Sequence, residues 1–532
     1  MGLRTALNRR FPVFDKLEPA TLDAGLKTGI RESVATHAQS ALTTGVFVVG
    51  LALQLGANNA TIGLLAAIPF LSQLMQLPSI FIIERVRNRR GISVISMIVS
   101  RSFLFAIAAT PLIPDDVLAR QVLVVSLILY GTTGSVCSCA WSSWMRDLVP
   151  EDRMGWYYAR RMFYGIGLAL GIGLLASGFI DLWQAWLPDF GRHVYTVVFL
   201  AGGVMGFVDT WLIARMPEAS MARPAKPSPL LKLLWQPFRD INFRRLLMFL
   251  VSWNFAINLA APFFTVYMLT LLNMPMSLVI IMTLVSQGAN VASVRVWGQM
   301  TDRFSNKAVL GVCAPLFIFA ILGWTFTTFP DPHRFTFVLV VTLHVLMGIS
   351  TAGVTLATSN IALKLSPRGA ATSYLAANSI GNSLAAGTAP ILGGLFADFF
   401  ASQELSWILQ WRSGDAEVVI RTLSFRFWDF FFFLAFLLGL YSIHRLSLVR
   451  EVGEVQERVV IRELLSLTRR SFRNLSSVAG LRVASYFPFA VLREARSASV
   501  SPQEQETEAA RAGENGSPPV VSGPAGPADT GP

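Results

Sequence analysis

The sequence predicts an all-α membrane protein in which twelve transmembrane helices form two parallel six-helix repeats. Three observations predict this fold class: the composition, apolar runs of membrane-spanning length, and landmarks that recur in the two halves of the chain. Of the 532 residues, 53% are hydrophobic and only 14% are charged, and the apolar residues gather in runs long enough to span a bilayer. An ordinary soluble domain carries about 25% charged residues. The composition therefore excludes a soluble enzyme of this size, and it also excludes a disordered chain.

Twelve runs qualify as spans, because a helix that crosses the membrane needs about 20 mostly apolar residues. Short polar connections separate them. The first six runs lie at 34–55, 62–83, 92–113, 121–144, 161–181 and 194–215. The second six lie at 246–269, 277–298, 307–329, 335–362, 373–397 and 426–447. An even number of spans places both chain ends on the same side of the membrane.

Basic residues are shared unevenly between the two sets of connections. The net charge is +12, from 44 Lys and Arg against 32 Asp and Glu. Most of the basic residues lie in the loops after even-numbered spans and in the tail, whereas the opposite loops hold few. Because basic loops stay on the cytoplasmic face, we predict that both termini are cytoplasmic. This placement explains most of the charge without a nucleic-acid partner.

Composition shifts divide the chain into six parts. A Pro-rich, basic stretch separates the two bundles. After the last span, apolar and basic residues alternate at helical spacing, which indicates an amphipathic helix on the membrane surface or a solvated helix packed on the loops. The end is rich in Pro, Gly, Ser and Glu, and we expect disorder there. The parts are an N-terminal segment, a bundle, a linker, a second bundle, an amphipathic tail and a disordered tail, at 1–33, 34–215, 216–245, 246–447, 448–495 and 496–532.

The two halves carry the same landmarks at a nearly constant separation along the chain. One landmark is an acid followed by an arginine, at Glu84 and again at Asp302. The other is a proline after the fourth and tenth spans, at Pro150 and Pro367. The two separations agree to within a single position, which indicates tandem duplication of a six-helix unit. A unit with an even number of spans keeps its orientation, so the halves are parallel repeats about an axis along the membrane normal.

One loop has a distinctive spacing of a glycine, an acid and basic residues. Between the eighth and ninth spans the chain reads Gly298-x-x-x-Asp302-Arg303-x-x-Asn306-Lys307. This segment resembles the loop signature of the major facilitator superfamily (MFS), and the resemblance covers residues 34 to 447. The first-half copy is degenerate, because Ile80 stands where the glycine belongs and Glu84 replaces the aspartate.

The resemblance implies secondary or facilitated transport of a small or medium organic solute. It implies alternating access, in which the two halves rock about a path lined mainly by the first, fourth, seventh and tenth spans. A non-transporting membrane scaffold or assembly factor with the same fold is the alternative, because a fold alone does not fix a function.

The signature loops are candidates for a gate. An acid at a helix boundary can pair with a neighbouring helix N-terminus and with basic residues of its own loop. Such contacts can form in one access state and break in the other; anchoring on the cytoplasmic face is the alternative role. The predicted gating residues are Glu84, Arg85, Arg89, Arg90, Gly298, Asp302, Arg303 and Lys307.

Two charged residues fall inside predicted spans, where an ionisable side chain is costly. Arg101 lies near the middle of the third span, and Asp209 lies near the cytoplasmic end of the sixth. We predict an intramembrane charge pair, which is either structural or part of a proton or substrate path. His37, which opens the first span, is either a proton carrier or a hydrogen-bonded polar group near a helix end.

The other polar side chains in the spans are mostly neutral. Asn254 and Asn258 are four residues apart and therefore share one face of the seventh span. Substrate contacts and interhelical hydrogen bonds are both open roles for such residues. The candidate pathway residues are His37, Gln39, Tyr130, Trp141, Trp253, Asn254, Asn258, Gln287, Asn290, His344, Asn378 and Asn382.

Other classes of protein find no motif to support them. The sequence contains no HExxH, nucleophile elbow or P-loop, so neither an enzyme nor a primary pump is predicted. Cys137, Cys139 and Cys313 lie in apolar runs without neighbouring metal ligands, and we predict no cofactor and no metal site.

The expected partners are a small-molecule substrate and the lipid bilayer, with proton or ion coupling as an open possibility. We expect a monomer. Arginine far outnumbers lysine, which suggests a GC-rich bacterial genome and hence the inner (plasma) membrane.

Overall fold

The computed structural model describes residues 3–14, 17–221, 237–328, 333–367, 371–413 and 416–451. Within these ranges, twelve helices are long and apolar enough to cross a membrane, and the predicted fold class is confirmed. The chain divides into two units, 1–457 and 458–532. All the described residues belong to the first unit. The predicted amphipathic and disordered tails lie outside the described residues from residue 452 onward.

The first half contains six spans, two of which are interrupted. A short helix and a two-residue strand precede them, and another two-residue strand follows. The helices are α1 (Leu3–Arg10), α2 (Pro19–Thr43), α3 (Val46–Gln54), α4 (Asn59–Ser72), α5 (Gln76–Val86), α6 (Arg89–Ala109), α7 (Asp116–Leu148), α8 (Met154–Trp186) and α9 (Val194–Arg215). The strands are β1 (Val13–Phe14) and β2 (Glu218–Ala219).

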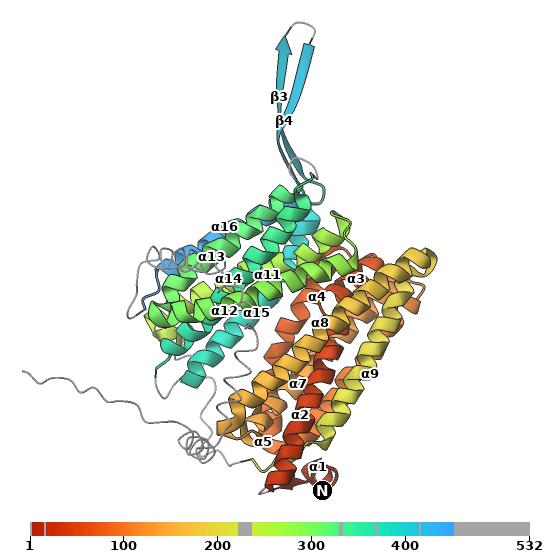
Figure 1. The fold of residues 1–532 in the computed structure, drawn as a ribbon, viewed down its shortest axis with the longest axis vertical. Helices are drawn as coiled ribbons and strands as arrows, with labels where there is room; N and C mark the ends of the chain where they lie inside the picture. The colour runs from red at the N-terminus through yellow and green to blue at the C-terminus, as the bar shows by residue number, and fades with distance from the viewer. Residues whose placement is uncertain are drawn as a thin grey trace, which may run out of the picture. The chain divides into compact units, whose positions relative to one another are not determined.

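The second half contains the other six spans and one hairpin. The helices are α11 (Ile241–Thr270), α12 (Met276–Arg303), α13 (Asn306–Gly323), α14 (Thr336–Lys364), α15 (Ala371–Phe400) and α16 (Trp428–Ser447). The strands are β3 (Glu404–Ser413) and β4 (Ala416–Arg426). Figure 1 shows the red-to-yellow helices of the first half and the green-to-blue helices of the second. We call the end of the bundle where α2 begins and α16 ends the terminal end, and the opposite one the far end.

The first span is longer than the sequence predicts. Hydropathy placed its start at residue 34, whereas α2 begins at Pro19, a residue that suits the first turn of a helix. The added turns bury Leu26 and Gly29 because α2 packs against α8 and α9. The span is then interrupted at Gly45, whose φ of 60° is a left-handed conformation that glycine adopts readily.

In the described residues, two pairs of helices make most of the contact between the halves. The main contact is α4 against α15, and the other is α8 against α12. On α4 and α15 the backbones touch: a Cβ on Gly63 would lie 2.0 Å from the Pro390 carbonyl oxygen, and one on Gly394 would lie 2.2 Å from the Asn59 carbonyl oxygen. Small residues permit such close packing of membrane helices. Because these glycines have no room for a side chain, α4 and α15 form the tightest joint between the halves.

A β-hairpin at the far end is the feature that the sequence analysis missed. Strands β3 and β4 pair antiparallel from Glu404 opposite Arg426 to Ser413 opposite Ala416, with an irregularity between Trp407 and Ile408. The hairpin lies between the eleventh and twelfth spans, where the sequence analysis predicts no helix or strand. Its signal in the sequence is a pair of runs rich in Ile, Val and Trp on either side of a Gly-Asp pair.

Candidate functional site

A cavity of about 720 Å³ lies between the two halves. This volume suits a small organic molecule. Most of the wall is apolar, and its polar side chains cluster on the first half. The polar and aromatic residues that line it include Glu32, Thr36, Arg101, Tyr130, Trp141 and Arg161 from the first half and Asn258 from the second.

Two ion pairs support the first-half wall. Arg161 Nη1 on α8 lies 2.6 Å from Glu32 Oε2 on α2, and Arg101 Nη2 on α6 lies 3.1 Å from Asp209 Oδ2 on α9. All four residues are buried. Since each pair joins two different helices, the pairs hold four spans of the first half together.

One hydroxyl group links the two ion pairs. Thr36 Oγ1 lies 3.1 Å from Glu32 Oε1 and 2.8 Å from Asp209 Oδ1. Glu32 and Thr36 line the cavity, whereas Asp209 is fully buried behind them. The site is therefore a continuous network from the cavity wall into the core of the first half.

The sequence analysis missed three members of this network, Glu32, Thr36 and Arg161. Glu32 stands two residues before the predicted start of the first span, Thr36 lies in the first turn of that span, and Arg161 is the first residue of the predicted fifth span. In the structure all three lie well inside longer helices, α2 and α8. The signal was opposite charge at the ends of two predicted spans, but sequence alone does not show that these helix ends are neighbours.

Tyr130 and Trp141 lie beside the arginines. The Tyr130 hydroxyl accepts hydrogen bonds from Arg101 Nη1 at 3.0 Å and from Gln39 Nε2 at 3.1 Å. The Trp141 ring lies under the Arg161 guanidinium, 4.5 Å from ring centroid to Cζ, which favours the cation. Two predicted pathway residues, Tyr130 and Trp141, thus line one polar wall, and a third, Gln39, is buried behind it and bonded to Tyr130.

The predicted asparagines of the second half line a separate cavity of about 340 Å³. Asn254 Nδ2 on α11 donates to Asn382 Oδ1 on α15 at 3.1 Å, and Asn382 Nδ2 donates to Asn378 Oδ1 at 3.0 Å. Trp253 also lines this cavity. Asn258 donates to the Asn254 carbonyl oxygen at 2.8 Å and lines the larger cavity. Helix α11 therefore contributes residues to both cavities.

Four predicted pathway residues lie elsewhere. His37 contacts the Ser33 carbonyl oxygen through Nδ1 at 2.7 Å and lines neither cavity. His344 is buried against Trp324, with 5.4 Å between ring centroids. On α12, Gln287 is exposed and Asn290 is half-buried. The structure therefore does not bring these four side chains to the two cavities.

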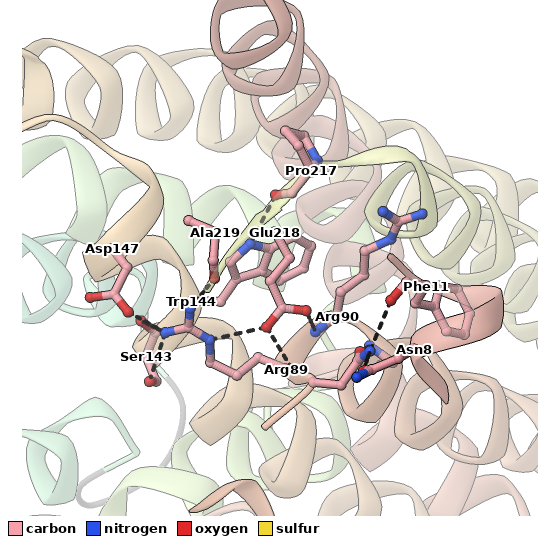
Figure 2. A network of polar contacts seen from close by, with 12 residues as sticks. Asn8, Phe11, Arg89, Arg90, Ser143, Trp144, Asp147, Pro217, Glu218 and Ala219 are labelled. Carbon is pink, nitrogen blue, oxygen red and sulfur yellow. Dashed lines mark hydrogen bonds and ion pairs between the residues drawn. The ribbon is translucent and has the colours of Figure 1, made fainter. Parts of the chain in front are cut away.

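At the terminal end, the loop that carries the first-half copy of the signature centres on Arg89. Figure 2 shows this fully buried side chain between Glu218 and Asp147. Arg89 Nε lies 3.2 Å from Glu218 Oε1, and Nη1 forms an ion pair with Asp147 Oδ2. The Glu218 carboxylate also accepts the backbone N–H groups of Arg89 and Arg90, at 2.8 and 3.0 Å. Glu218 therefore caps the N-terminus of α6, where a negative charge is favourable.

The pairing of β1 with β2 holds Glu218 in this position. Val13 lies opposite Glu218 in a short parallel pair. Trp144 Nε1 donates to the Pro217 carbonyl oxygen at 3.0 Å, and Arg89 Nη2 donates to the Ala219 carbonyl oxygen at 2.9 Å. The chain leaving α9 is thus bonded to α6 and α7 (Figure 2).

The second half repeats this arrangement with Glu451. Its carboxylate accepts the backbone N–H of Lys307 at 2.8 Å, Asn306 Nδ2 at 2.8 Å and Lys364 Nζ at 2.9 Å. Burial alone raises the pKa of Glu451, but these three donors outweigh it and hold the pKa below its ordinary value. Glu451 therefore caps the N-terminus of α13 as an ionised carboxylate.

The acids of the predicted gating motif lie outside these networks. Glu84, Arg85, Asp302 and Arg303 are all exposed. A Cβ on Gly298 would meet Leu356 Cδ2 at 3.8 Å, which is an ordinary contact, so no close backbone approach requires that glycine here. In this structure the buried members of the motif are Arg89 and Lys307, and they are bonded to acids that the motif does not contain.

At the far end, two aspartates cross between the halves. Asp181 on α8 accepts the N–H groups of Met276 and Ser277 at the start of α12, both at 2.8 Å. Asp398 on α15 accepts the N–H groups of Asn59 and Ala60 at the start of α4, at 3.0 and 2.9 Å, and Asn59 Nδ2 at 2.9 Å. Each half thus caps a helix of the other.

These far-end contacts repeat at the separation of the sequence landmarks. Asp181 and Asp398 are as far apart along the chain as the two landmark prolines are. Asn59 and Met276, whose N–H groups they accept, have the same separation. Sequence analysis could have found the aspartates by this separation. It could not have found their partners, because a backbone N–H group leaves no mark in the sequence.

Twelve spans, two six-helix halves and a cavity between them define a membrane transporter. In the residues that the structure describes, no group of three or more His, Cys, Asp and Glu side chains is arranged to hold a metal ion. A family model described as Major Facilitator Superfamily matches residues 33–342. The chain belongs to the Major Facilitator Superfamily, and it is a multi-pass membrane transporter of small organic solutes rather than an enzyme.

Solved structures of other transporters share the fold. The nucleoside transporter NupG is 13% identical with a TM-score of 0.58, over 80% of this chain and 98% of that one. A D-xylose-proton symporter is 12% identical with a TM-score of 0.56, over 81% and 99%. A bacterial homolog of the human lysosomal transporter Spinster, in an inward-facing and unoccupied conformation, is 16% identical with a TM-score of 0.52, over 72% and 84%. Comparison with curated protein sequences finds no match.

Proposed function

We propose that the larger cavity is the solute site and that the solute is amphipathic. The observation that carries this proposal is that both halves line one cavity, with charged groups on one side and apolar surface around most of the rest. Asn258 supplies an amide from the second half. A solute with an apolar body and one or two polar groups would fit such a wall.

The halves would alternate between two states around this cavity. Bonds between the halves lie at the far end, through Asp181 and Asp398, whereas the described bonds at the terminal end stay within one half. This asymmetry supports a state in which the solute enters and leaves at the terminal end. Glu84 and Asp302, exposed in this state, are our candidates for gate acids that become bonded when the terminal end closes.

The bias of basic residues supports a terminal end that faces the cytoplasm. The transporter would then lie in the bacterial inner (plasma) membrane and act as a monomer, with the six parts of the chain divided as the composition predicts. The structure described would be open toward the cytoplasm.

The test is a thermal-shift screen of the purified protein in detergent with uridine and D-xylose, a nucleoside and a sugar of the kinds named for two of the similar structures. A solute at 100 times its Kd stabilises its protein by about 2.7 kcal/mol. We expect a stabilising solute to lose its effect in Asn258→Trp, where the indole fills the cavity.

The matched control is Gln287→Trp, which places the same side chain on an exposed position outside both cavities. It should keep the solute response. An equal response of the wild type and Asn258→Trp to every stabilising solute would place the solute site elsewhere. Flux of the same solute into proteoliposomes then separates a transporter from a binding scaffold.

A further inference from the structure

The Thr36 hydroxyl group has one hydrogen atom to share between two carboxylates. Thr36 Oγ1 lies within hydrogen-bond distance of two carboxylates, Glu32 at 3.1 Å and Asp209 at 2.8 Å. It can donate to only one of them at a time, while its lone pairs can accept. If both acids were ionised, one contact would bring two acceptor oxygens together in a buried site, which is unfavourable.

We propose that Glu32, Thr36 and Asp209 form a site that holds one exchangeable proton. With one proton, both contacts become hydrogen bonds: one acid donates to Thr36 Oγ1, and Thr36 donates to the other acid. The proton then couples solute movement to the proton gradient. The binding of the proton follows from the geometry alone, whereas the coupling rests on the proposed function of the cavity.

The charges around the site limit it to one proton. Arg101 and Arg161 supply two positive charges, and Glu32 and Asp209 supply two negative charges when ionised. The cluster is therefore neutral without the proton and carries a charge of +1 with it. A second proton would leave two buried guanidinium groups without an anionic partner, which is strongly disfavoured.

The other titratable groups around the site are hydrogen-bonded or buried. The Tyr130 hydroxyl accepts from Arg101 at 3.0 Å, and the Tyr157 hydroxyl accepts from Arg161 at 3.4 Å. His37, one turn from Ser33 on α2, contacts that residue's carbonyl oxygen. Cys137 is a buried thiol on α7. Glu32 and Asp209 are therefore the groups of this cluster that we assign to proton exchange.

The site also has a route to water. Glu32 and Thr36 line the cavity, while Asp209 has no exposed surface. A hydronium ion in the cavity can pass a proton to Glu32 Oε1, the oxygen that faces Thr36, and leave as neutral water. Glu32 can then give its hydrogen to Thr36 Oγ1 as Thr36 gives its own to Asp209. This exchange returns Thr36 to a neutral hydroxyl and leaves the proton on Asp209.

The proton changes the contacts of the first half. When it lies on Glu32, the 2.6 Å pair between Glu32 and Arg161 loses its charge attraction. Arg161 keeps its hydrogen bond to the Gly29 carbonyl oxygen at 3.1 Å and its place over Trp141. A charged group on the cavity wall is then free for a solute or for the other access state.

Infrared difference spectroscopy of the full chain in nanodiscs, without solute, tests the proton site. A protonated carboxyl group absorbs apart from a carboxylate, and the band shifts when the carboxyl carbon is labelled with carbon-13. We expect one protonated carboxyl band that disappears as the pH is raised. It should shift in protein labelled either at glutamate or at aspartate.

Variants assign the band to the site. Glu32→Gln and Asp209→Asn should each abolish it, and Thr36→Val, which keeps the side-chain shape, should change its frequency or its titration. Because Glu32→Gln leaves Arg161 unpaired, the double variant Glu32→Gln/Arg161→Gln provides a second test in a neutral setting. Glu151→Gln, which removes an exposed carboxylate paired with the exposed Arg146, should leave the band unchanged.

The outcomes separate this inference from the proposed function. No titrating carboxyl band in the folded wild type would overturn the proton site. A band that persists in both Glu32→Gln and Asp209→Asn would place the proton elsewhere and overturn it as well. A band assigned to the site, together with flux that ignores the proton gradient, would overturn the coupling and leave the solute site standing.

Discussion

The two ends of this transporter use the same contact for different purposes. Apart from local caps such as Asp115 and Asp240, two carboxylates at each end cap the N-termini of helices that are distant in the sequence. At the terminal end, Glu218 and Glu451 cap α6 and α13 of their own halves. At the far end, Asp181 and Asp398 cap α12 and α4 of the opposite halves. The chemistry is alike, so the location of the partner decides what each contact controls.

A cap within one half persists when the halves move as rigid units, so it contributes to stability in every state. A cap between halves must break when the far end opens, so it contributes only to this state. By thermodynamic linkage, removing the second kind shifts the populations of the states. The comparison therefore predicts unfolding phenotypes at the terminal end and conformational phenotypes at the far end.

The largest effect is expected for Arg89→Ala. This change leaves the buried Glu218 without its cationic partner, and breaking a buried ion pair from one side costs about 3–5 kcal/mol. Denaturant unfolding in detergent micelles should show this loss. Arg85→Ala, at an exposed position in the same loop, should change stability by less than about 0.5 kcal/mol. Equal stability of the two variants would contradict the role given to the Arg89 network.

Asp398→Asn should open the far end while the protein stays folded. The carboxylate accepts three N–H groups, and bonds to a charged group contribute about 1.5–3 kcal/mol each. The open population should rise at least tenfold, which corresponds to about 1.4 kcal/mol. Spin labels at the exposed positions Gln54 and Ser402, with the native cysteines replaced by alanine, would report a longer distance.

The control for that experiment is Glu218→Gln, which weakens a cap within one half. The comparison predicts lower stability but an unchanged distance between the two labels. If Glu218→Gln lengthened the distance as much as Asp398→Asn does, the distinction between the two kinds of cap would fail.

Asp181→Asn should produce a smaller opening of the far end. Asp181 accepts two N–H groups rather than three, and α8 and α12 form the lesser joint between the halves. The same pair of spin labels measures the effect. Because the two aspartates act on one rigid-body equilibrium, the double variant should give roughly the sum of the two free-energy changes. An effect of Asp181→Asn larger than that of Asp398→Asn would reverse the expected order.

The smallest effect is a pH dependence at Glu451. Its pKa is lowered in the folded state from an ordinary value of 4.5, so its contribution to stability is fully present above that value. The contribution is lost as the pH falls through the folded-state pKa. Thermal unfolding from pH 7 to pH 3.5 should therefore show the wild type losing its advantage over Glu451→Gln below about pH 4.5. A constant difference over that range would show that Glu451 does not titrate as described.

The spans and the repeat could be predicted because they leave periodic marks in the sequence. Runs of apolar residues gave twelve spans, and two landmarks such as Pro150 and Pro367 gave the duplication. The prediction failed at helix ends, because a helix continues into polar residues that no longer belong to an apolar run. This is why the prediction left Glu32 outside the first span and placed Arg161 at the very start of the fifth, although both residues support the cavity wall.

The contacts of the caps were beyond reach for a different reason. Glu218 and Asp398 bond to backbone N–H groups, which every residue except proline possesses, so no residue type identifies the partner. The gating motif drew attention to Glu84 and Asp302, yet those acids are exposed in this state. The sequence motif predicts a gate at this place, and the structure shows which acids of the terminal end are bonded.

The far-end caps also bear on how such a chain could arise. Asp181 of the first copy caps the second copy, and Asp398, at the matching position of the second copy, caps the first in return. A contact in which each partner offers the same patch to the other is the form of a two-fold symmetric dimer interface. Two separate six-helix proteins would meet through this pair of contacts without any change of sequence. Fusion of the two genes would then preserve an interface that was already complete.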